Sequence, residues 1–297
     1  MKLSKIFLLL LLVLCKLSMA TTSYDNEVAK YTNNNESLCV AQMQGLIESQ
    51  DFLSAKKLGE QSYHATHSAK VALYLGKTYY MLHKYDKAIV YFKKAAEKGE
   101  GLAMLTLGNI YGSGVGGYKS NIQAVNWYTQ AVARGNVQAM NYLGLMNRDG
   151  LTGESANYVQ ALKLFNMAAQ RDNPEGYFNL GYMYQMGLGV ATDYQRAIAL
   201  YTKAADLGNK YAMNNLGLIY NQGLGVKLDY LQSLSWYTKS AVLGDANAQC
   251  NVGIFYYQGN GVPKDYKRAK SWFKLAKSSG CKIADDYLKK INNQQNK

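Results

Sequence analysis

Hydrophobic and small residues recur at steps of three and four positions through most of the chain, from about residue 36 to Ile291. Such spacing is typical of amphipathic helices, because it places the apolar side chains on one face of a helix with 3.6 residues per turn. Glycine-containing segments separate one stretch of this pattern from the next. The pattern therefore predicts an all-α chain whose helices are joined by short turns.

The pattern also repeats as a whole. A glycine preceded by leucine or valine returns at intervals of 36, 37, 36 and 36 residues, at Gly108, Gly144, Gly181, Gly217 and Gly253. Most of these glycines are followed, at similar distances, by a tyrosine, a Gly-x-Gly-Val segment, an Asp-Tyr pair and a closing glycine. A period of this length predicts a solenoid in which each unit is a pair of helices.

Three features shared by several units have a local structural role. The glycines of the Gly-x-Gly-Val segment supply the turn between the two helices, because glycine accepts a positive φ without a Cβ clash. The aspartate after the turn is suited to cap the second helix, and a later glycine ends that helix. The predicted caps are Asp193, Asp229 and Asp265, and the predicted stops are Gly208, Gly244 and Gly280.

The repeated order Ala-x-x-x-Leu-Gly-x-x-Tyr, Gly-x-Gly-Val, Asp-Tyr and Ala-Ala-x-x-Gly resembles that of the Sel-one-like repeat family, a relative of the tetratricopeptide repeats. The resemblance covers five units over residues 101–280 and, more loosely, degenerate tetratricopeptide-like helical pairs over 36–100. It implies an α/α superhelix, a TPR-like solenoid of helical hairpins, whose role in the family is to hold other proteins together. A capping helix and a polar tail are expected over 281–297.

One unit departs from the family pattern. The unit at 137–172 has Asp149-Gly150-Leu-Thr-Gly153 in place of Gly-x-Gly-Val. Its turn is therefore expected to differ from the turns of the other units.

The first twenty residues have the pattern of a secretory signal peptide. Two lysines precede an apolar run over residues 6–14, and Ser18-Met19-Ala20 is a small-x-small ending. The run is shorter than the roughly 20 residues that a membrane-spanning helix needs. Cleavage between Ala20 and Thr21 would leave a flexible segment over 21–35. We expect an exported protein, located in the periplasm or secreted.

Composition and charge narrow the class of partner. The chain has 297 residues, of which 48% are hydrophobic and two are proline, which excludes a wholly disordered or collagen-like protein. Its formal net charge is +13, and removal of residues 1–20 leaves 30 basic and 20 acidic side chains. This charge favours anionic partners such as acidic proteins, envelope polymers or membrane surfaces, whereas export disfavours nucleic acid. A basic surface that only keeps the protein soluble explains the charge equally well.

No combination of residues indicates catalysis, a metal or a cofactor. Residues 112–117 contain Gly-x-Gly-x-x-Gly, but a dinucleotide site needs a preceding strand, and this segment lies between two predicted helices. Glu60, His64 and His67 share one helical face and are interpreted as a polar helix end rather than a metal site. The aromatic residues at one repeat position are predicted to be core: Tyr128, Phe165, Tyr201, Tyr237 and Phe273.

The cysteines suggest one disulfide. Cys250 lies early in the first helix of its unit and Cys281 directly follows the second, so antiparallel packing brings them together, and an exported compartment is oxidising. The alternative is a small buried Cys250 with an exposed Cys281; Cys39 is expected to be a free thiol. A cysteine-rich secreted branch of the family, some members of which bind or slowly hydrolyse β-lactams, has a cysteine where Cys250 stands, but Ala241 occupies the position of its usual partner.

The predicted function is therefore an exported, non-catalytic scaffold that binds proteins or peptides on its concave face. The first helices of related repeats line that face, and an asparagine stands two residues before the repeat glycine in three units. These asparagines, with polar and tyrosine residues four or five positions after the glycine, are the predicted binding residues: Asn179, Gln185, Asn215, Asn221, Gln222, Asn251, Tyr257 and Gln258. Amides both donate and accept, which suits the backbone of an extended peptide.

Three alternatives to this reading remain open. The inner face can be a solvated surface that binds no partner, with asparagines that are only part of the repeat pattern. The protein can be a cell-envelope enzyme, β-lactamase-like or acting on peptidoglycan. It can also be a structural subunit of an envelope complex.

Overall fold

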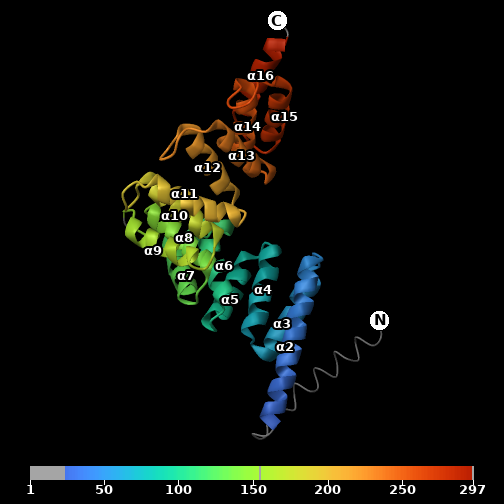
Figure 1. Ribbon diagram of the computed structural model, residues 1–297. Coiled ribbons are helices and arrows are strands. Elements are labelled where there is room, and N and C mark those ends of the chain that lie inside the picture. Colours follow the sequence, from blue (N-terminus) through green and yellow to red (C-terminus); the bar gives the residue numbers. More distant parts are fainter. Residues whose placement is uncertain (1–23, 154, 296–297) are drawn as a thin grey trace. The chain divides into compact units, whose positions relative to one another are not determined.

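The computed structural model describes residues 24–153 and 155–295, with side chains over 35–153 and 155–294 (Figure 1). The predicted signal peptide lies outside the described residues. All regular structure within the described ranges is helical, so the fold is all-α and of the α/α superhelix class, as the repeat pattern predicts. The helices form two compact units, which meet in the sequence at Asn136 and Val137.

The first unit contains six α-helices and one short 3-10 turn among its described residues. They are α2 (Tyr24–Glu48), α3 (Phe52–Thr66), α4 (Ala69–Met81), α5 (Tyr85–Glu97), α6 (Gly101–Ser113), η1 (Val115–Gly117) and α7 (Asn121–Ala133). Helix α2 begins at Tyr24 and so includes most of the segment 21–35, which the sequence predicts to be flexible. Once a helix is nucleated, each further residue adds a backbone hydrogen bond, so a helix can extend through residues of modest propensity.

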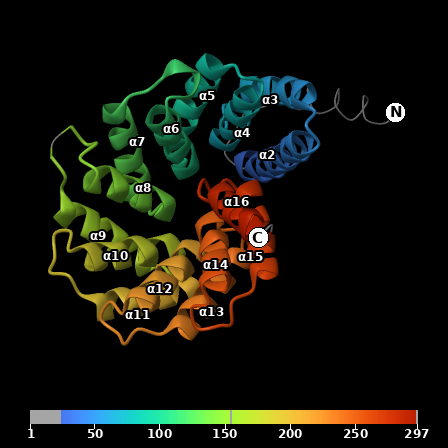
Figure 2. The same cartoon turned by 90° about the horizontal axis from the view of Figure 1, so that it is seen from above.

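The second unit contains nine α-helices among its described residues. They are α8 (Val137–Arg148), α9 (Tyr158–Ala169), α10 (Pro174–Met186), α11 (Tyr194–Asp206), α12 (Lys210–Gln222), α13 (Tyr230–Val242), α14 (Ala246–Gln258), α15 (Tyr266–Ser278) and α16 (Ala284–Gln295). Consecutive helices pair as hairpins, and Figure 2 shows α8, α10, α12 and α14 on the inner side of the curve of this unit, with α9, α11 and α13 outside them. This arrangement leaves one face of each first helix open on the inner side.

The repeat glycine allows the two helices of a hairpin to approach closely. A Cβ atom on Gly217 would stand 2.6 Å from a ring carbon of Tyr237, and one on Gly181 would stand 2.9 Å from the ring of Tyr201. The same close approach occurs at Gly76, Gly108, Gly144 and Gly253 with the rings of Phe92, Tyr128, Phe165 and Phe273. All these rings are buried, which confirms the predicted aromatic core. Glycine is thus required here by packing.

The ends of the helices also follow the predicted signals. The carboxylates of Asp193, Asp229 and Asp265 each accept a hydrogen bond of 2.9 Å from the backbone N–H three residues later. Such caps satisfy one of the free N–H groups at a helix start. The predicted stops have positive φ angles, +87° at Gly208, +79° at Gly244 and +95° at Gly280. The local signals of the repeat therefore operate as predicted.

The turn of the departing unit is different. Nine residues, 149–157, separate α8 from α9, whereas seven residues, 223–229, separate α12 from α13. The backbone N–H of Asn157 still donates to the carbonyl of Asn147, at 2.8 Å, as Asp229 does to Tyr220 at 2.9 Å. The longer turn thus begins and closes with the same kind of contact as the regular ones.

Helix α16 occupies the place of a further first helix but differs at the glycine position. Ala284 is fully buried, as are the alanines at the same repeat position, for example Ala212 and Ala248. The repeat glycine would fall five residues later, where this chain has Lys289, whose side chain is exposed. Ile291 completes the buried face of α16. A lysine at this position cannot accept the close aromatic contact that glycine accepts in the earlier units.

Candidate partner-binding face

The candidate site is the inner face of the second unit, formed by α8, α10, α12 and α14 (Figure 2). Helix α12 shows how the sequence creates this face. Its buried side consists of Ala212, Met213, Leu216, Gly217 and Ile219, which pack against neighbouring helices. Its open side carries Tyr211, Asn214, Asn215, Leu218 and Gln222, which are half-buried or exposed. Apart from the adjacent Asn214 and Asn215, these positions follow one another at steps of three and four, so they form one continuous stripe.

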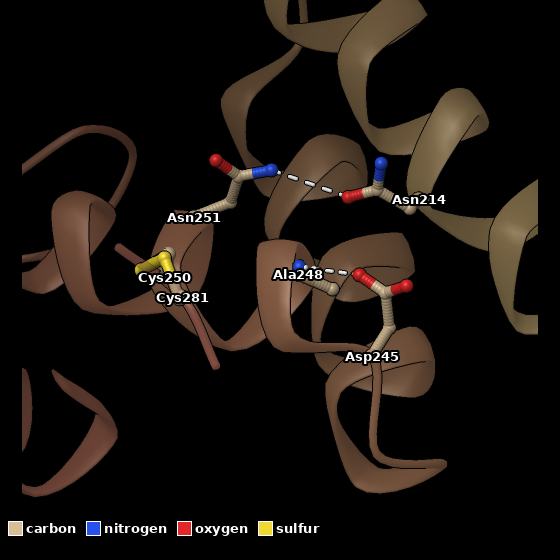
Figure 3. Close-up of a disulfide and its surroundings, with 6 residues drawn as sticks. All are labelled: Asn214, Asp245, Ala248, Cys250, Asn251 and Cys281. Atoms are coloured by element: carbon tan, nitrogen blue, oxygen red, sulfur yellow. Dashed lines mark hydrogen bonds between the residues drawn. A yellow bond between two sulfur atoms is a disulfide. The ribbon is translucent and has the colours of Figure 1, made fainter. Parts of the chain in front are cut away.

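The three repeat asparagines are not equivalent. The side chain of Asn179 is buried, with only 6% of its surface exposed. The amide of Asn215 donates to the hydroxyl oxygen of Tyr201 at 3.1 Å. The side-chain amide of Asn251 donates to the side-chain oxygen of Asn214 at 3.2 Å, and this bond joins α14 to α12 (Figure 3). At least two of these amides therefore hold neighbouring repeats together.

Tyr201 connects two further predicted residues. Its hydroxyl donates to the amide carbonyl of Gln185 at 2.7 Å while accepting from Asn215, so it joins α10, α11 and α12. Its ring is fully buried, and this burial raises the pKa of the Tyr201 hydroxyl well above its ordinary value. The hydroxyl therefore remains a neutral donor over the whole physiological range. Gln185 and Asn215 are positioned by this shared contact.

The remaining predicted residues lie toward the ends of α12 and α14. Asn221 is half-buried and Gln222 is exposed on α12. The ring of Tyr257 lies between those of Tyr266 and Tyr287, at centroid distances of 5.5 and 5.3 Å, so it belongs to the contact with the last helices. Gln258 accepts a hydrogen bond of 2.9 Å from Asn260 in the following turn. These contacts fix Tyr257 and Gln258 within the fold.

The inner face also contains apolar side chains that the prediction from the sequence missed. Tyr182, Leu218 and Ile254 each stand three residues after a repeat asparagine and are half-buried. Tyr211 has 54% of its surface exposed, and its ring lies 6.1 Å from that of Phe178 on the preceding first helix. The signal that could have revealed them is their fixed offset from the asparagines, since three residues make almost one helical turn. The face is therefore a mixture of aromatic, aliphatic and amide groups.

The last hairpin is held by the disulfide between Cys250 and Cys281 (Figure 3). Their Cα atoms are 6.7 Å apart, and the bond joins the second turn of α14 to the short segment between α15 and α16. Cys250 is buried beside Phe273 and Ile291. The bond thus joins α14 to the start of the capping segment.

Cys39 is a free thiol in the other unit. Its S–H donates to the hydroxyl of Ser62 at 2.9 Å. Burial raises the pKa of this thiol, which makes it a weaker nucleophile at neutral pH.

Other kinds of site receive no support from the described part of the chain. No group of three His, Cys, Asp or Glu side chains there is arranged to hold a metal ion. Two shallow hollows of about 490 and 500 Å³ lie at the turns before α13 and α11. They are open to solvent and include none of the predicted binding residues. Among the described residues, no helix is both long and apolar enough to span a membrane.

The comparisons with known proteins define the family. The family model of the Sel1 repeat matches six consecutive segments: residues 69–100, 101–136, 137–173, 174–209, 210–245 and 246–281. The chain belongs to the Sel1 repeat family, whose members bind other proteins. The first of the six segments extends the family beyond the five units predicted over 101–280, because residues 69–100 also match the repeat.

Two solved structures are similar over most of the chain. One is c5321, a protective antigen of uropathogenic Escherichia coli with an SLR fold, at 34% identity and a TM-score of 0.71 over 81% of this chain and 52% of that one. The other is a Sel1 repeat protein from Oxalobacter formigenes, at 31% identity and a TM-score of 0.64 over 74% of this chain and 96% of that one.

A curated relative is the ERAD-associated E3 ubiquitin-protein ligase component HRD3B of Arabidopsis thaliana, 34% identical over 99 residues. The match covers 33% of this chain and 15% of the relative. The chain therefore matches less than a sixth of the length of this relative.

Proposed function

We propose that this protein is an exported scaffold that binds an extended segment of another protein on the inner face of its second unit. The observation that carries this proposal is the stripe of half-exposed aromatic and aliphatic side chains, Tyr182, Leu218 and Ile254, flanked by amides on the same helices. Apolar groups next to polar groups of fixed orientation are typical of protein-binding surfaces, where a few aromatic anchors supply most of the affinity.

The geometry of the amides refines the role of each predicted residue. Asn215 and Asn251 each use one amide N–H in a bond within the protein, which leaves the oxygen atom and the second N–H of each amide for a ligand. Asn221 and Gln222 lie on the open side of α12 and can offer both donors and acceptors. Each hydrogen bond to a peptide contributes a net of only about 1 kcal/mol to binding. The apolar stripe is therefore the main source of affinity.

The relatives support a role in assembly. HRD3B is named as a component of a ubiquitin ligase, and 99 of its residues align with this chain at 34% identity. We propose that the present chain also acts by binding, without chemistry of its own. Purified protein should not hydrolyse a chromogenic β-lactam; turnover that disappears with a single Ser→Ala change would refute this part of the proposal.

Two paired variants test the binding face. The first changes the inner face, Tyr211→Ala with Leu218→Ser. The second removes exposed apolar groups from the outer helix α13, Leu231→Ser with Val242→Ser, where the side chains are 64% and 74% exposed. Both variants should keep the helical circular dichroism of the wild type, because Tyr211, Leu231 and Val242 are exposed and Leu218 is only half-buried.

Affinity capture from the native cell envelope then identifies the partner, and titration calorimetry measures its affinity. We expect the inner-face variant to lose at least ten-fold in affinity, since central aromatic anchors contribute more than about 1 kcal/mol each. The outer-face variant should bind like the wild type. Equal binding by all three proteins, or loss in the outer-face variant alone, would contradict the proposal.

A further inference from the structure

The positive charge of the chain is concentrated at its C-terminal end and in one earlier segment. Residues 264–297 hold ten basic and three acidic side chains, and residues 56–98 hold nine basic and three acidic ones. Between them, residues 99–263 hold ten basic and nine acidic side chains and are almost neutral. The charge is therefore a local property of particular helices, which a uniform need for solubility does not explain.

Helix α15 carries lysines along one side. Lys267, Lys270, Lys274 and Lys277 follow one another at steps of three, four and three residues. This spacing keeps them within about a quarter of the helix circumference. The buried side of the same helix is formed by Ala269, Phe273 and Ala276, so the lysines lie on the surface.

The contacts between α15 and α16 add a fifth lysine to this group. Lys277 forms an ion pair of 2.6 Å with Asp285, and Lys270 donates to the side-chain oxygen of Asn292 at 2.7 Å. Lys289 lies one turn after Asp285 and one turn before Asn292, on the same side of α16. It therefore borders the segment of α15 that contains Lys274. We call Lys267, Lys270, Lys274, Lys277 and Lys289 the C-terminal lysine patch.

The patch has a strong excess of positive charge. Among the described residues, Asp285 is the one carboxylate that forms an ion pair with any of these five lysines. Lys267, Lys274 and Lys289 are exposed. Neither of the two hollows includes any residue of the patch. Lysines spread along a helix surface suit an extended counterpart with many negative charges.

The residue types of the C-terminal lysine patch favour a lipid surface over a protein as its partner. Protein interfaces are depleted in lysine and centred on aromatic or arginine anchors, whereas the patch consists of lysines with Ser271 and Ser278 beside them on the exposed side of α15. Lysine ammonium groups are mobile point charges that do not require a fixed partner geometry. Clusters of four to eight basic residues on a helix are the pattern associated with anionic phospholipids.

We propose that the C-terminal lysine patch binds the surface of a membrane that contains anionic phospholipids. The contact is electrostatic and peripheral, without insertion of a helix. It is separate from the inner face that we propose for protein binding, because the patch lies on the exposed sides of the last two helices. The protein would thereby hold its protein partner close to a bilayer.

Sedimentation with lipid vesicles tests the proposal on the full mature chain. Vesicles of phosphatidylcholine alone are compared with vesicles that also contain phosphatidylglycerol. The test variant is Lys267→Gln, Lys274→Gln and Lys289→Gln, which spares Lys270 and Lys277 because they contact α16. The matched control has the same net charge, with Lys163, Lys203 and Lys227 changed to Gln, which are also exposed in the second unit.

The wild type and the control should bind the phosphatidylglycerol vesicles and not the neutral ones, and added salt should release them. The test variant should bind about 100-fold more weakly, since each of the three lysines contributes roughly five-fold to binding near an anionic surface. Equal binding to both kinds of vesicle would overturn the proposal. So would equal binding by the test variant and the control, or patch-dependent binding to polyglutamate without binding to vesicles.

Discussion

A ring carbon of Tyr237 lies 2.6 Å from the point where a Cβ atom on Gly217 would stand. The ring is buried, with 2% of the residue exposed, and its centroid lies 5.7 Å from that of Phe255. It therefore cannot move aside without displacing other core residues. This relationship recurs in each of the six repeats and determines how closely the two helices of a hairpin pack.

The variant Gly217→Ala should be destabilised by about 1–3 kcal/mol, because the added methyl group overpacks the hairpin. Gly45→Ala is the matched control, since Gly45 lies within a helix and a Cβ there would meet no atom within 4 Å. That control should be neutral or stabilised by about 0.5–1 kcal/mol through its higher helix propensity. Urea unfolding followed by circular dichroism measures both. Equal stability of the two variants would show that the ring does not occupy the place of the Cβ.

The disulfide should stabilise the last hairpin. Cys250 and Cys281 are 31 positions apart, and a loop of this size corresponds to about 3.5–4 kcal/mol from restriction of the unfolded chain. Cys281→Ser should therefore lower the resistance of α14 to α16 to proteolysis more than that of the first unit. Peptide mapping by mass spectrometry under non-reducing conditions checks the bond directly. It should find Cys250 joined to Cys281 and Cys39 alkylated; a mixed bond that includes Cys39 would contradict the structure.

The buried hydroxyl of Tyr201 should make stability fall at alkaline pH. Because the pKa of Tyr201 is raised in the folded protein, the unfolded chain loses this proton first, near pH 10. The stability that the Tyr201 hydroxyl contributes is fully present below about pH 10. It is lost as the pH rises toward the pKa of Tyr201 in the folded protein. Tyr201→Phe loses two hydrogen bonds and should be less stable by about 1–2 kcal/mol at pH 7.

The difference in stability between wild type and Tyr201→Phe should become smaller above pH 10. Urea unfolding at pH 7, 9 and 10.5 measures this difference, and the other tyrosines affect both proteins equally. A difference that does not change between pH 7 and pH 10.5 would show that the Tyr201 hydroxyl is not protected from ionisation.

The N-terminal segment leads to a prediction about processing. The basic start, short apolar run and small-x-small ending of residues 1–20 should direct export and cleavage between Ala20 and Thr21. N-terminal sequencing of the protein purified from its native source should begin at Thr21. A chain that still begins at Met1, or within the apolar run, would contradict the export proposal.

Much of the fold could be predicted from the sequence because its signals are local. The cap at Asp229, the turn at Gly223 to Val226 and the stop at Gly244 act on backbone groups within a few residues of themselves. The repetition over five units makes these weak signals decisive, since each unit reinforces the same assignment. The extent of α2 was not predicted, because helix propagation through the asparagine-rich segment depends on the rest of the helix.

The tertiary structure decided what the surface side chains do. The sequence places Asn215 and Asn251 on the inner face, but only the distances between helices show that their amides bond to Tyr201 and Asn214. In the same way, the lysine period of α15 is visible in the sequence, whereas the approach of Lys289 depends on the register between α15 and α16. Helix formation is determined by neighbours along the chain, and the partners of a side chain are determined by which helices pack together.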